Sequence, residues 1–428
     1  MPVNRRRFIK QGIGMVSLGV VMPRVWLTGA RAQTSDPNRR VLVVIQLSGG
    51  NDGLNTVIPY TDPNYRRLRP NLGFKEADLK DGQGRSTIIS NQFGFHPALA
   101  EVKQLFDDGK VAVVLGVGYP EPSQSHFLSE DYWHTANLVD GKGSGWLGRY
   151  AEEALAGQAG FHAAAIGGRL PRTLMSDRFV VPSIFNFSDY GFRTSPAFPA
   201  NRPNKLAAMN ALYSRRFPEG SFKGVAGGVG FDAVSGSIRL TEAIQGYTST
   251  VVYPDSNPLA RAMKMVAQMI VTIPEANLLH AEVGGFDNHA EQITDTNMSG
   301  LHALLLQNFS QAVKLFHDDM AEHGLADNVL ILPWSEFGRR PEENGSRGTD
   351  HGSSSCMFVI GNKVRGGLYG EQPSLAAADL DVSGNLKSKV DFRSVYATVL
   401  EDWLDADSNA ILRGRFDNLG VLASGAGG

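Results

Sequence analysis

Apolar runs and amphipathic stretches alternate along most of the chain. Nearly unbroken apolar runs occupy 41–47 and 111–119, and the stretch 96–110 between them spaces its apolar residues at helical intervals. An unbroken apolar run is typical of a strand covered on both faces, and two such strands joined through a helix run parallel. The pattern therefore predicts an α/β fold with a mostly parallel sheet and helices on both of its faces.

The same alternation returns in the second half of the chain. Three amphipathic helices are predicted at 257–270, 300–324 and 391–404, and three strands within 277–292, 328–340 and 355–361. Between about 168 and 255 the periodicity is lost, and aromatic and glycine-rich stretches take its place. We expect this region to be an insertion or cap in a single domain that spans 33–428.

The first 32 residues are typical of an export signal and not of the fold. A basic start, "RRRFIK", precedes a short apolar run and the small-residue end "ARA". The pair Arg5-Arg6 indicates the twin-arginine type, which carries proteins that are already folded. We expect cleavage after Ala32, no stable membrane anchor afterwards, and a periplasmic or secreted protein whose partners include the twin-arginine export machinery.

The charge balance argues against one class of partner, and the cysteine content excludes one kind of covalent bond. Residues 1–32 hold six of the 41 basic residues and no acidic one, so 35 basic residues face 43 acidic ones in the rest of the chain. This balance leaves no basic patch that would favour nucleic acid. Cys356 is the only cysteine, so an internal disulfide is impossible.

Acidic residues follow several predicted strands at the point where each apolar run ends. Asp52 follows the first run after "SGGN", and Asp287 and Glu336 follow two later runs. Because the carboxyl ends of parallel strands meet at one edge of a sheet, we expect these acids to share a cleft. Crowded carboxylates repel one another unless a cation or a proton lies between them.

Histidines accompany two of these acids. His289 lies two residues after Asp287, and "GTDHG" at 348–352 adds Asp350 and His351. Mixed oxygen and nitrogen ligands suit one divalent metal ion, or two about 4 Å apart around a phosphoryl group. Zinc, manganese, magnesium and calcium stay open as its identity. Each motif also has a plain structural interpretation: an Asx-turn, a solvent-facing imidazole, a local ion pair or a polar turn.

A candidate nucleophile lies in "PSQSHF" at 122–127. Ser123 and Ser125 follow a predicted strand and stand at a predicted helix start, where free backbone N–H groups favour an anionic substrate and an ionised serine. Ser125 is the first choice because it is closer to the helix. A plain N-cap serine is the alternative. His126 is either a partner of that serine or a packed side chain.

The motifs together resemble one known family. The twin-arginine start with "LSGGNDGLNTVIPY", "SQSHFLSEDYW", "GGFDNHAEQ" and "SEFGRR…GTDHG" is similar, over almost the whole mature chain, to the DUF1501 family of exported bacterial proteins. That family is grouped with the alkaline phosphatase and sulfatase superfamily, whose members are α/β metalloenzymes acting on phosphate or sulfate esters. The resemblance implies that Asp52 binds metal at the first strand end and that Ser125 or Ser123 is the nucleophile.

The resemblance leaves two registers open for the last ligands. In one, Asp350 and His351 form the superfamily's Asp-His-Gly motif. In the other, Glu336 and Phe337 replace that Asp and His, and His351 is the later single histidine. We prefer the second register because no histidine follows residue 351. In both, one metal site lacks a ligand.

The implied function is that of an exported metal-dependent hydrolase of phosphate or sulfate esters. Ser125 attacks the anionic centre in this hypothesis, and Arg339 holds substrate oxygens as a bidentate donor. The metal ligands are Asp52, Asp287, His289, Glu336, Asp350 and His351. The alternatives are a non-catalytic periplasmic binding protein on the same fold and a phosphotransferase or isomerase.

Overall fold

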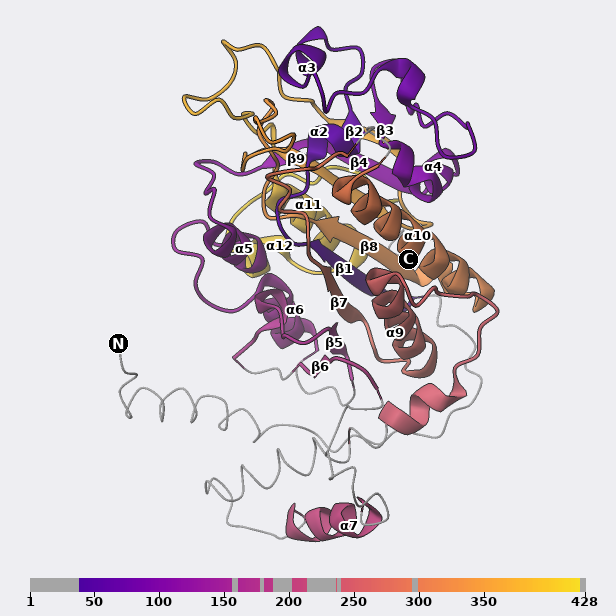
Figure 1. The fold of residues 1–428 in the computed structure, drawn as a ribbon. Helices are drawn as coiled ribbons and strands as arrows, with labels where there is room; N and C mark the ends of the chain where they lie inside the picture. Colours follow the sequence, from indigo (N-terminus) through magenta and orange to yellow (C-terminus); the bar gives the residue numbers. More distant parts are fainter. Residues whose placement is uncertain are drawn as a thin grey trace.

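A computed structural model places most of the chain in an α/β fold (Figure 1). It describes residues 38–155, 161–177, 181–187, 202–213, 236, 240–294 and 299–423. The predicted export signal lies outside these residues, and so does much of the predicted insertion. Among the described residues, no helix is both long and apolar enough to cross a membrane.

One large sheet forms the centre of the molecule. Its strands lie in the order β10-β4-β9-β8-β1-β7-β5-β6, and β11 pairs with β4 beside this path. The strands are β1 (Val41–Leu47), β4 (Val111–Gly118), β5 (Ala163–Ile166), β6 (Ser183–Ile184), β7 (Leu278–Val283), β8 (Val329–Trp334), β9 (Ser355–Ile360), β10 (Gly367–Gly370) and β11 (Val390–Asp391). A separate two-stranded antiparallel sheet pairs β2 (Val57–Ile58) with β3 (Gly94–Phe95).

The sheet is mostly parallel, as the sequence predicts. β1 runs parallel to both of its neighbours, β7 and β8, and is buried along its whole length. The exception among the described strands of this sheet is β9, which is antiparallel to β4 and β8. Because β9 is reversed, its beginning lies at the edge where β1, β4, β7 and β8 end. The loop before β9 therefore joins the loops that follow those four strands.

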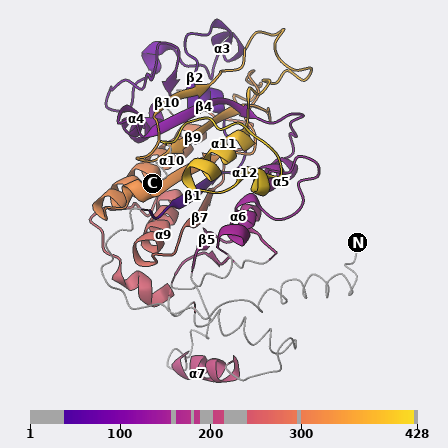
Figure 2. The same ribbon diagram turned by 180° about the vertical axis from the view of Figure 1, so that it is seen from behind.

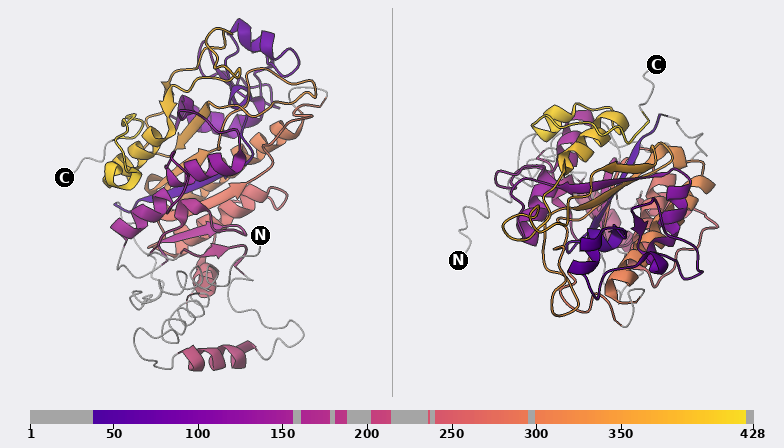
Figure 3. Two further views of the ribbon diagram at one scale, coloured as in Figure 1. Left: turned by 90° about the vertical axis from the view of Figure 1, so that its left-hand side faces the viewer. Right: turned by 90° about the horizontal axis from the view of Figure 1, so that it is seen from above.

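Helices cover both faces of the sheet. Alternate residues of β1 point to opposite faces, so Val43 and Ile45 join one core cluster while Leu42 and Val44 join the other. The first face carries α4, α9 and α10, and the second carries α5, α6, α11 and α12, which come to the front when the molecule is turned (Figures 1 and 2). Seen from above, α11 and α12 (yellow) lie across the sheet from α10 (orange; Figure 3).

The predicted helices form within a few residues of their expected bounds. Asn257 caps α9 by accepting a hydrogen bond from the backbone N of Ala260, and Pro258 fills its first turn. The long α10 ends before Gly324, whose φ is +69°. The α-helices are α2 (Gly53–Thr56), α3 (Pro63–Leu68), α4 (Ala100–Asp107), α5 (His126–Thr135), α6 (Trp146–Ala154), α7 (Arg202–Tyr213), α9 (Pro258–Thr272), α10 (Leu301–Glu322), α11 (Phe392–Thr398) and α12 (Ser408–Leu412).

The last predicted helix differs in one respect. Residues 391–404 form α11 followed by a π-helical turn over Val399–Trp403, and not one uniform α-helix. The indole Nε1 of Trp403 donates a hydrogen bond to the carbonyl of Val41 at 3.1 Å. This contact fastens the C-terminal helices to the start of β1.

Candidate metal centre

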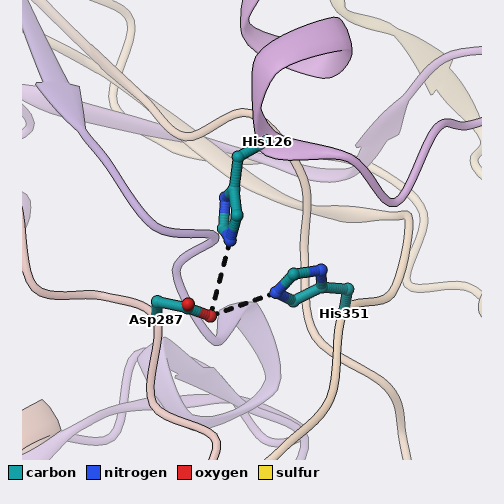
Figure 4. A group of neighbouring side chains, drawn as sticks. All are labelled: His126, Asp287 and His351. Atoms are coloured by element: carbon teal, nitrogen blue, oxygen red, sulfur yellow. Dashed lines mark hydrogen bonds and ion pairs between the residues drawn. The ribbon is translucent and has the colours of Figure 1, made fainter.

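Three imidazoles and one carboxylate converge at the edge where the parallel strands end. His126 begins α5 after β4, Asp287 and His289 follow β7, and His351 precedes the reversed strand β9. Nε2 of His289 and Nε2 of His351 lie 3.0 and 3.1 Å from Oδ1 of Asp287, and Nε2 of His126 lies 3.5 Å from the same oxygen. Figure 4 shows His126 and His351 pointing at Asp287 from different sides.

The other ring nitrogen of each histidine is held by an acceptor. Nδ1 of His351 donates to the carbonyl of Gln124 at 2.8 Å, which requires a hydrogen on that nitrogen. Nδ1 of His126 lies 2.7 Å from Oε1 of Glu336, and Nδ1 of His289 lies 3.0 Å from Oδ1 of Asp350. Since these partners accept, each neutral imidazole carries its hydrogen on Nδ1 and a lone pair on Nε2.

The donor atoms of His126, Asp287 and His351 all lie within 4.8 Å of one another and thus face one point, and Nε2 of His289 lies beside this group. Nε2 of His289 lies only 2.9 Å from Nε2 of His351, so at most one hydrogen fits between them. Such a group of electron-pair donors is unfavourable unless a cation or a proton lies among them. Neighbouring ligands of one metal with bonds of about 2.1 Å lie about 3.0–3.4 Å apart, and the three Nε2 atoms lie 3.0, 3.1 and 3.5 Å from Oδ1 of Asp287. These residues therefore fit a metal ion, with each histidine oriented by an outer acceptor.

Arg339 fixes the carboxylate of this cluster. Its Nη2 donates to Oδ1 of Asp287 at 2.7 Å, and its guanidinium is fully buried. Partial burial would raise the pKa of Asp287, but the hydrogen bond and the positive charge of Arg339 outweigh it and hold that pKa well below its usual range. Asp287 is therefore a carboxylate at any physiological pH, as a metal ligand must be.

The remaining donors of Arg339 are used within the protein. Nε donates to the carbonyl of Gly50 at 2.7 Å and Nη1 to that of Thr349 at 2.8 Å, and Nη2 also reaches the carbonyls of Gly49 and Phe286. Arg339 therefore joins the loops after β1 and β7 to the loop before β9. The sequence predicts a substrate-binding role for Arg339, and in the structure its guanidinium contacts Asp287 and backbone carbonyls.

Glu336 orients His126 from a fully buried position. Its Oε1 accepts from the backbone N of Gly49 at 2.8 Å and from Nδ1 of His126, and its Oε2 accepts from the hydroxyl of Ser335 at 3.1 Å. The hydrogen bond from Glu336 raises the pKa of His126 above its ordinary value, and partial burial only partly opposes this. A more basic imidazole is a stronger ligand. Glu336, a predicted ligand, is therefore one step removed from the cluster.

Asp350 occupies a similar outer position. Its Oδ1 accepts from His289 and, at 3.1 Å, from the side-chain amide of Asn344. These two hydrogen bonds lower the pKa of Asp350, so it stays a carboxylate. Of the pair in "GTDHG", His351 faces the cluster directly and Asp350 acts through His289.

Asp52 lies in a separate buried ion pair. Its Oδ2 accepts from Nη1 of Arg69 at 2.7 Å and from the amide of Gln292 at 2.6 Å. Burial alone would raise the pKa of Asp52. The effect of Arg69 is opposite and prevails, so the pKa lies below its ordinary value. The structure does not bring this predicted ligand into the group formed by His126, Asp287 and His351.

The two candidate serines lie beside the cluster on the loop before α5. Ser125 is exposed at the N-cap of that helix, and its hydroxyl does not cap the helix. The hydroxyl of Ser123 accepts from the backbone N of Ser125 at 3.2 Å. Gln124, between them, is the residue whose carbonyl holds His351. The loop is thus fastened next to the imidazoles, and the Ser125 side chain is left free of the helix.

Two glycines let the segments approach this closely. Gly49 has a φ of +120°, and a Cβ there would lie 2.5 Å from the backbone N of Asp287. Gly50 has a φ of +75°, and a Cβ there would overlap the ring of Phe337. Both glycines adopt the left-handed backbone of a sharp turn, and the space beside them holds protein atoms.

His126 is the member of the cluster to which the sequence analysis gave no ligand role. It follows the end of β4 as Asp287 follows that of β7, and this shared placement was the available signal. Several other histidines are buried elsewhere in the fold: His96, His162 and His280 are 2%, 5% and 2% exposed. His280 lies in β7, and helices cover both faces of that strand.

The sheet and its edge define an α/β protein with a candidate metal centre at the carboxyl ends of its parallel strands. Residues 261–413 match the family described as "Protein of unknown function (DUF1501)". The match confirms the resemblance over the segment that holds Asp287, His289 and His351, while His126 lies outside it. No curated protein matches the chain.

Solved structures with remote similarity include three from bacteria. A protein in the alkaline phosphatase superfamily from Vibrio parahaemolyticus is 9% identical, with a TM-score of 0.39, over 95% of this chain and 78% of that one. A sulfatase from Pseudoalteromonas sp. is 13% identical, with a TM-score of 0.37, over 90% and 72%. The C-terminal periplasmic domain of EcEptC from Escherichia coli, in complex with Zn, is 9% identical, with a TM-score of 0.34, over 80% and 78%.

Proposed function

We propose that the protein is an exported metal-dependent hydrolase of phosphate or sulfate esters whose metal is held by His126, Asp287 and His351, with His289 beside them. The observation that carries this proposal is the convergence of three imidazole lone pairs on the Asp287 carboxylate, each imidazole oriented through its Nδ1. A bound metal would polarise an ester oxygen and stabilise the charge on the leaving oxygen.

The donor set favours some metals over others. Imidazole nitrogens together with one carboxylate suit zinc, manganese or iron, whereas magnesium and calcium prefer oxygen ligands. The side chains of Asp287 and His289 are 48% and 44% exposed, so a substrate oxygen has access to the cluster from solvent. We therefore expect zinc or manganese to support activity better than magnesium or calcium.

Residues of the chain supply the rest of the chemistry. The hydroxyl oxygen of Ser125 attacks the phosphorus or sulfur atom, the ester oxygen leaves, and water later releases the group from the serine. The first N–H groups of α5 have no carbonyl partner within the helix, so they favour the anionic oxygens of the substrate. Glu336 keeps His126 in the orientation that the cluster needs, and Arg339 does the same for Asp287.

Turnover of aryl phosphate and aryl sulfate esters tests the proposal. Metal-free protein is assayed with zinc, manganese, magnesium or calcium added back, and Ser125→Ala is compared with Ser123→Ala. We expect turnover with zinc or manganese, its loss in Ser125→Ala, and substantial activity in Ser123→Ala. A folded sample that turns over no ester with any metal would refute the hydrolase. If that sample still bound zinc, the result would favour the alternative of a non-catalytic binding protein.

A further inference from the structure

A buried arginine is bound to the one strand-end acid that the cluster does not use. Arg69, just after α3, is fully buried, and its Nη1 donates to Oδ2 of Asp52 at 2.7 Å. Asp52 follows β1, the central strand that lies between β7 and β8. An arginine is charged at every accessible pH, so this pairing neutralises Asp52 permanently.

Arg69 cannot leave that position without breaking several other contacts. Its Nη1 also donates to Oδ1 of Asn55 at 2.7 Å, its Nη2 to the carbonyl of Arg340 at 2.8 Å, and its Nε to the carbonyl of Pro341 at 2.9 Å. Every guanidinium nitrogen thus has a partner. The side chain is a fixed part of the fold that ties the loop after β1 to the loop after β8.

The two other predicted carboxylate ligands besides Asp287 also have partners in the structure. Glu336 accepts from Gly49, Ser335 and His126, and Asp350 accepts from His289 and Asn344. Asp287 is left as the carboxylate that faces the three Nε2 atoms. A second divalent ion near Asp52 would meet the positive charge of Arg69, and like charges at close range in a buried site repel strongly.

We infer that this edge of the sheet binds a single metal ion per chain, and that Arg69 is a built-in cation that occupies Asp52 in place of a second one. The inference rests on the proposed metal site and adds its stoichiometry. It also makes Asp52 part of the permanent structure, where the sequence predicts a ligand. Metal bound at the cluster therefore depends on His351 and not on Asp52.

Counting the bound metal tests this inference without an activity assay. Protein freed of metal is loaded with excess zinc, passed through a desalting column, and analysed by elemental mass spectrometry. We expect one zinc per chain in the parent protein, one in Asp52→Asn, and a loss of at least tenfold in zinc affinity in His351→Asn. Two zinc ions per chain, or loss of the bound ion in Asp52→Asn, would overturn the single-metal site.

The double variant Arg69→Met/Asp52→Asn keeps the test valid if Asp52→Asn alone fails to fold. It removes both charges together, so no unpaired charge is left in the interior, and we expect it to keep one zinc. Loss of zinc from this folded variant would also overturn the inference. A count of zero in the parent protein would instead refute the proposed metal site itself, and with it this inference.

Discussion

Zinc binding should raise the thermal stability of the protein by an amount that depends on Nε2 of His351. A ligand at a thousand times its Kd stabilises the folded state by about 4 kcal/mol. Unfolding entropy of about 2.1 cal/mol/K per residue gives about 0.8–0.9 kcal/mol/K for a chain of 428 residues. The ratio of these two values predicts a rise of about 5 °C in Tm at saturating zinc.

Two substitutions of His351 separate its two nitrogens. Asparagine places an amide near the position of Nδ1 and can keep the hydrogen bond to the carbonyl of Gln124. It removes Nε2, whose lone pair faces Asp287. Glutamine reaches the position of Nε2 and loses the bond to Gln124. If His351→Asn costs a hundredfold in affinity, the same zinc concentration raises Tm by only about 1.5 °C.

Differential scanning calorimetry with and without zinc measures these shifts. We expect the largest rise in the parent protein, a smaller rise in His351→Gln, and the smallest in His351→Asn. A rise in His351→Asn equal to that of the parent would refute the reasoning, because it would show that zinc stabilises the fold without Nε2. Equal Tm values of the three proteins without zinc would show that the substitutions act on binding and not on folding.

Two further predictions concern the surroundings of the cluster. Gly49→Ala should destabilise the fold by about 1–3 kcal/mol and weaken zinc binding, because its φ is +120° and its Cβ would lie 2.5 Å from the backbone N of Asp287. Gly84→Ala is the control, because Gly84 has a φ of +79° and open space around its Cβ. A zinc titration should show unchanged binding in this control. Burial lowers the pKa of His280 and of His134 to about 3, so both stay neutral in the folded state while the unfolded chain binds protons below about pH 6.5. The contribution of each neutral histidine to the free energy of unfolding is therefore complete above pH 6.5 and is lost as the pH falls towards 3. The loss is about 2 kcal/mol at pH 5. In urea unfolding at pH 7 and pH 5, His280→Leu should lose less stability between the two values than the parent, and an equal loss would contradict the assigned burial effect.

More of the fold than of the candidate site could be predicted from the sequence. Apolar runs identify buried strands because burial on both faces favours apolar residues at every position, and β1 and β4 are buried along their whole length with Gln46 as their one polar residue. Their order in the sheet could not be predicted, because β8 and β9 lie between them. The direction of β9 could not be predicted either, because an apolar run looks the same in a parallel and in an antiparallel strand.

The residues that gather at this edge of the sheet could be predicted only in part. The position of a residue after a strand indicates which edge it reaches, and Asp287 and His289 lie after β7 at the expected edge. His351 reaches the same edge because β9, which follows it, is reversed. Which acceptor each side chain meets depends on contacts between distant loops. Arg69, from the turn after α3, takes Asp52, and Glu336 takes His126 across 210 positions of sequence. No periodic pattern in the chain encodes such pairings.

The reversed strand β9 has a consequence for the order of folding and metal uptake. The cluster takes its members from the segments after β4 and β7 and from the segment before β9, so it cannot exist until β9 has inserted between β4 and β8. Ligands so far apart in sequence bind an ion only after the long-range sheet contacts have formed. If the predicted signal sends the chain across a membrane already folded, the choice of metal is made on the side where the protein is synthesised. The ion available there, and not the one abundant outside, would then occupy the site.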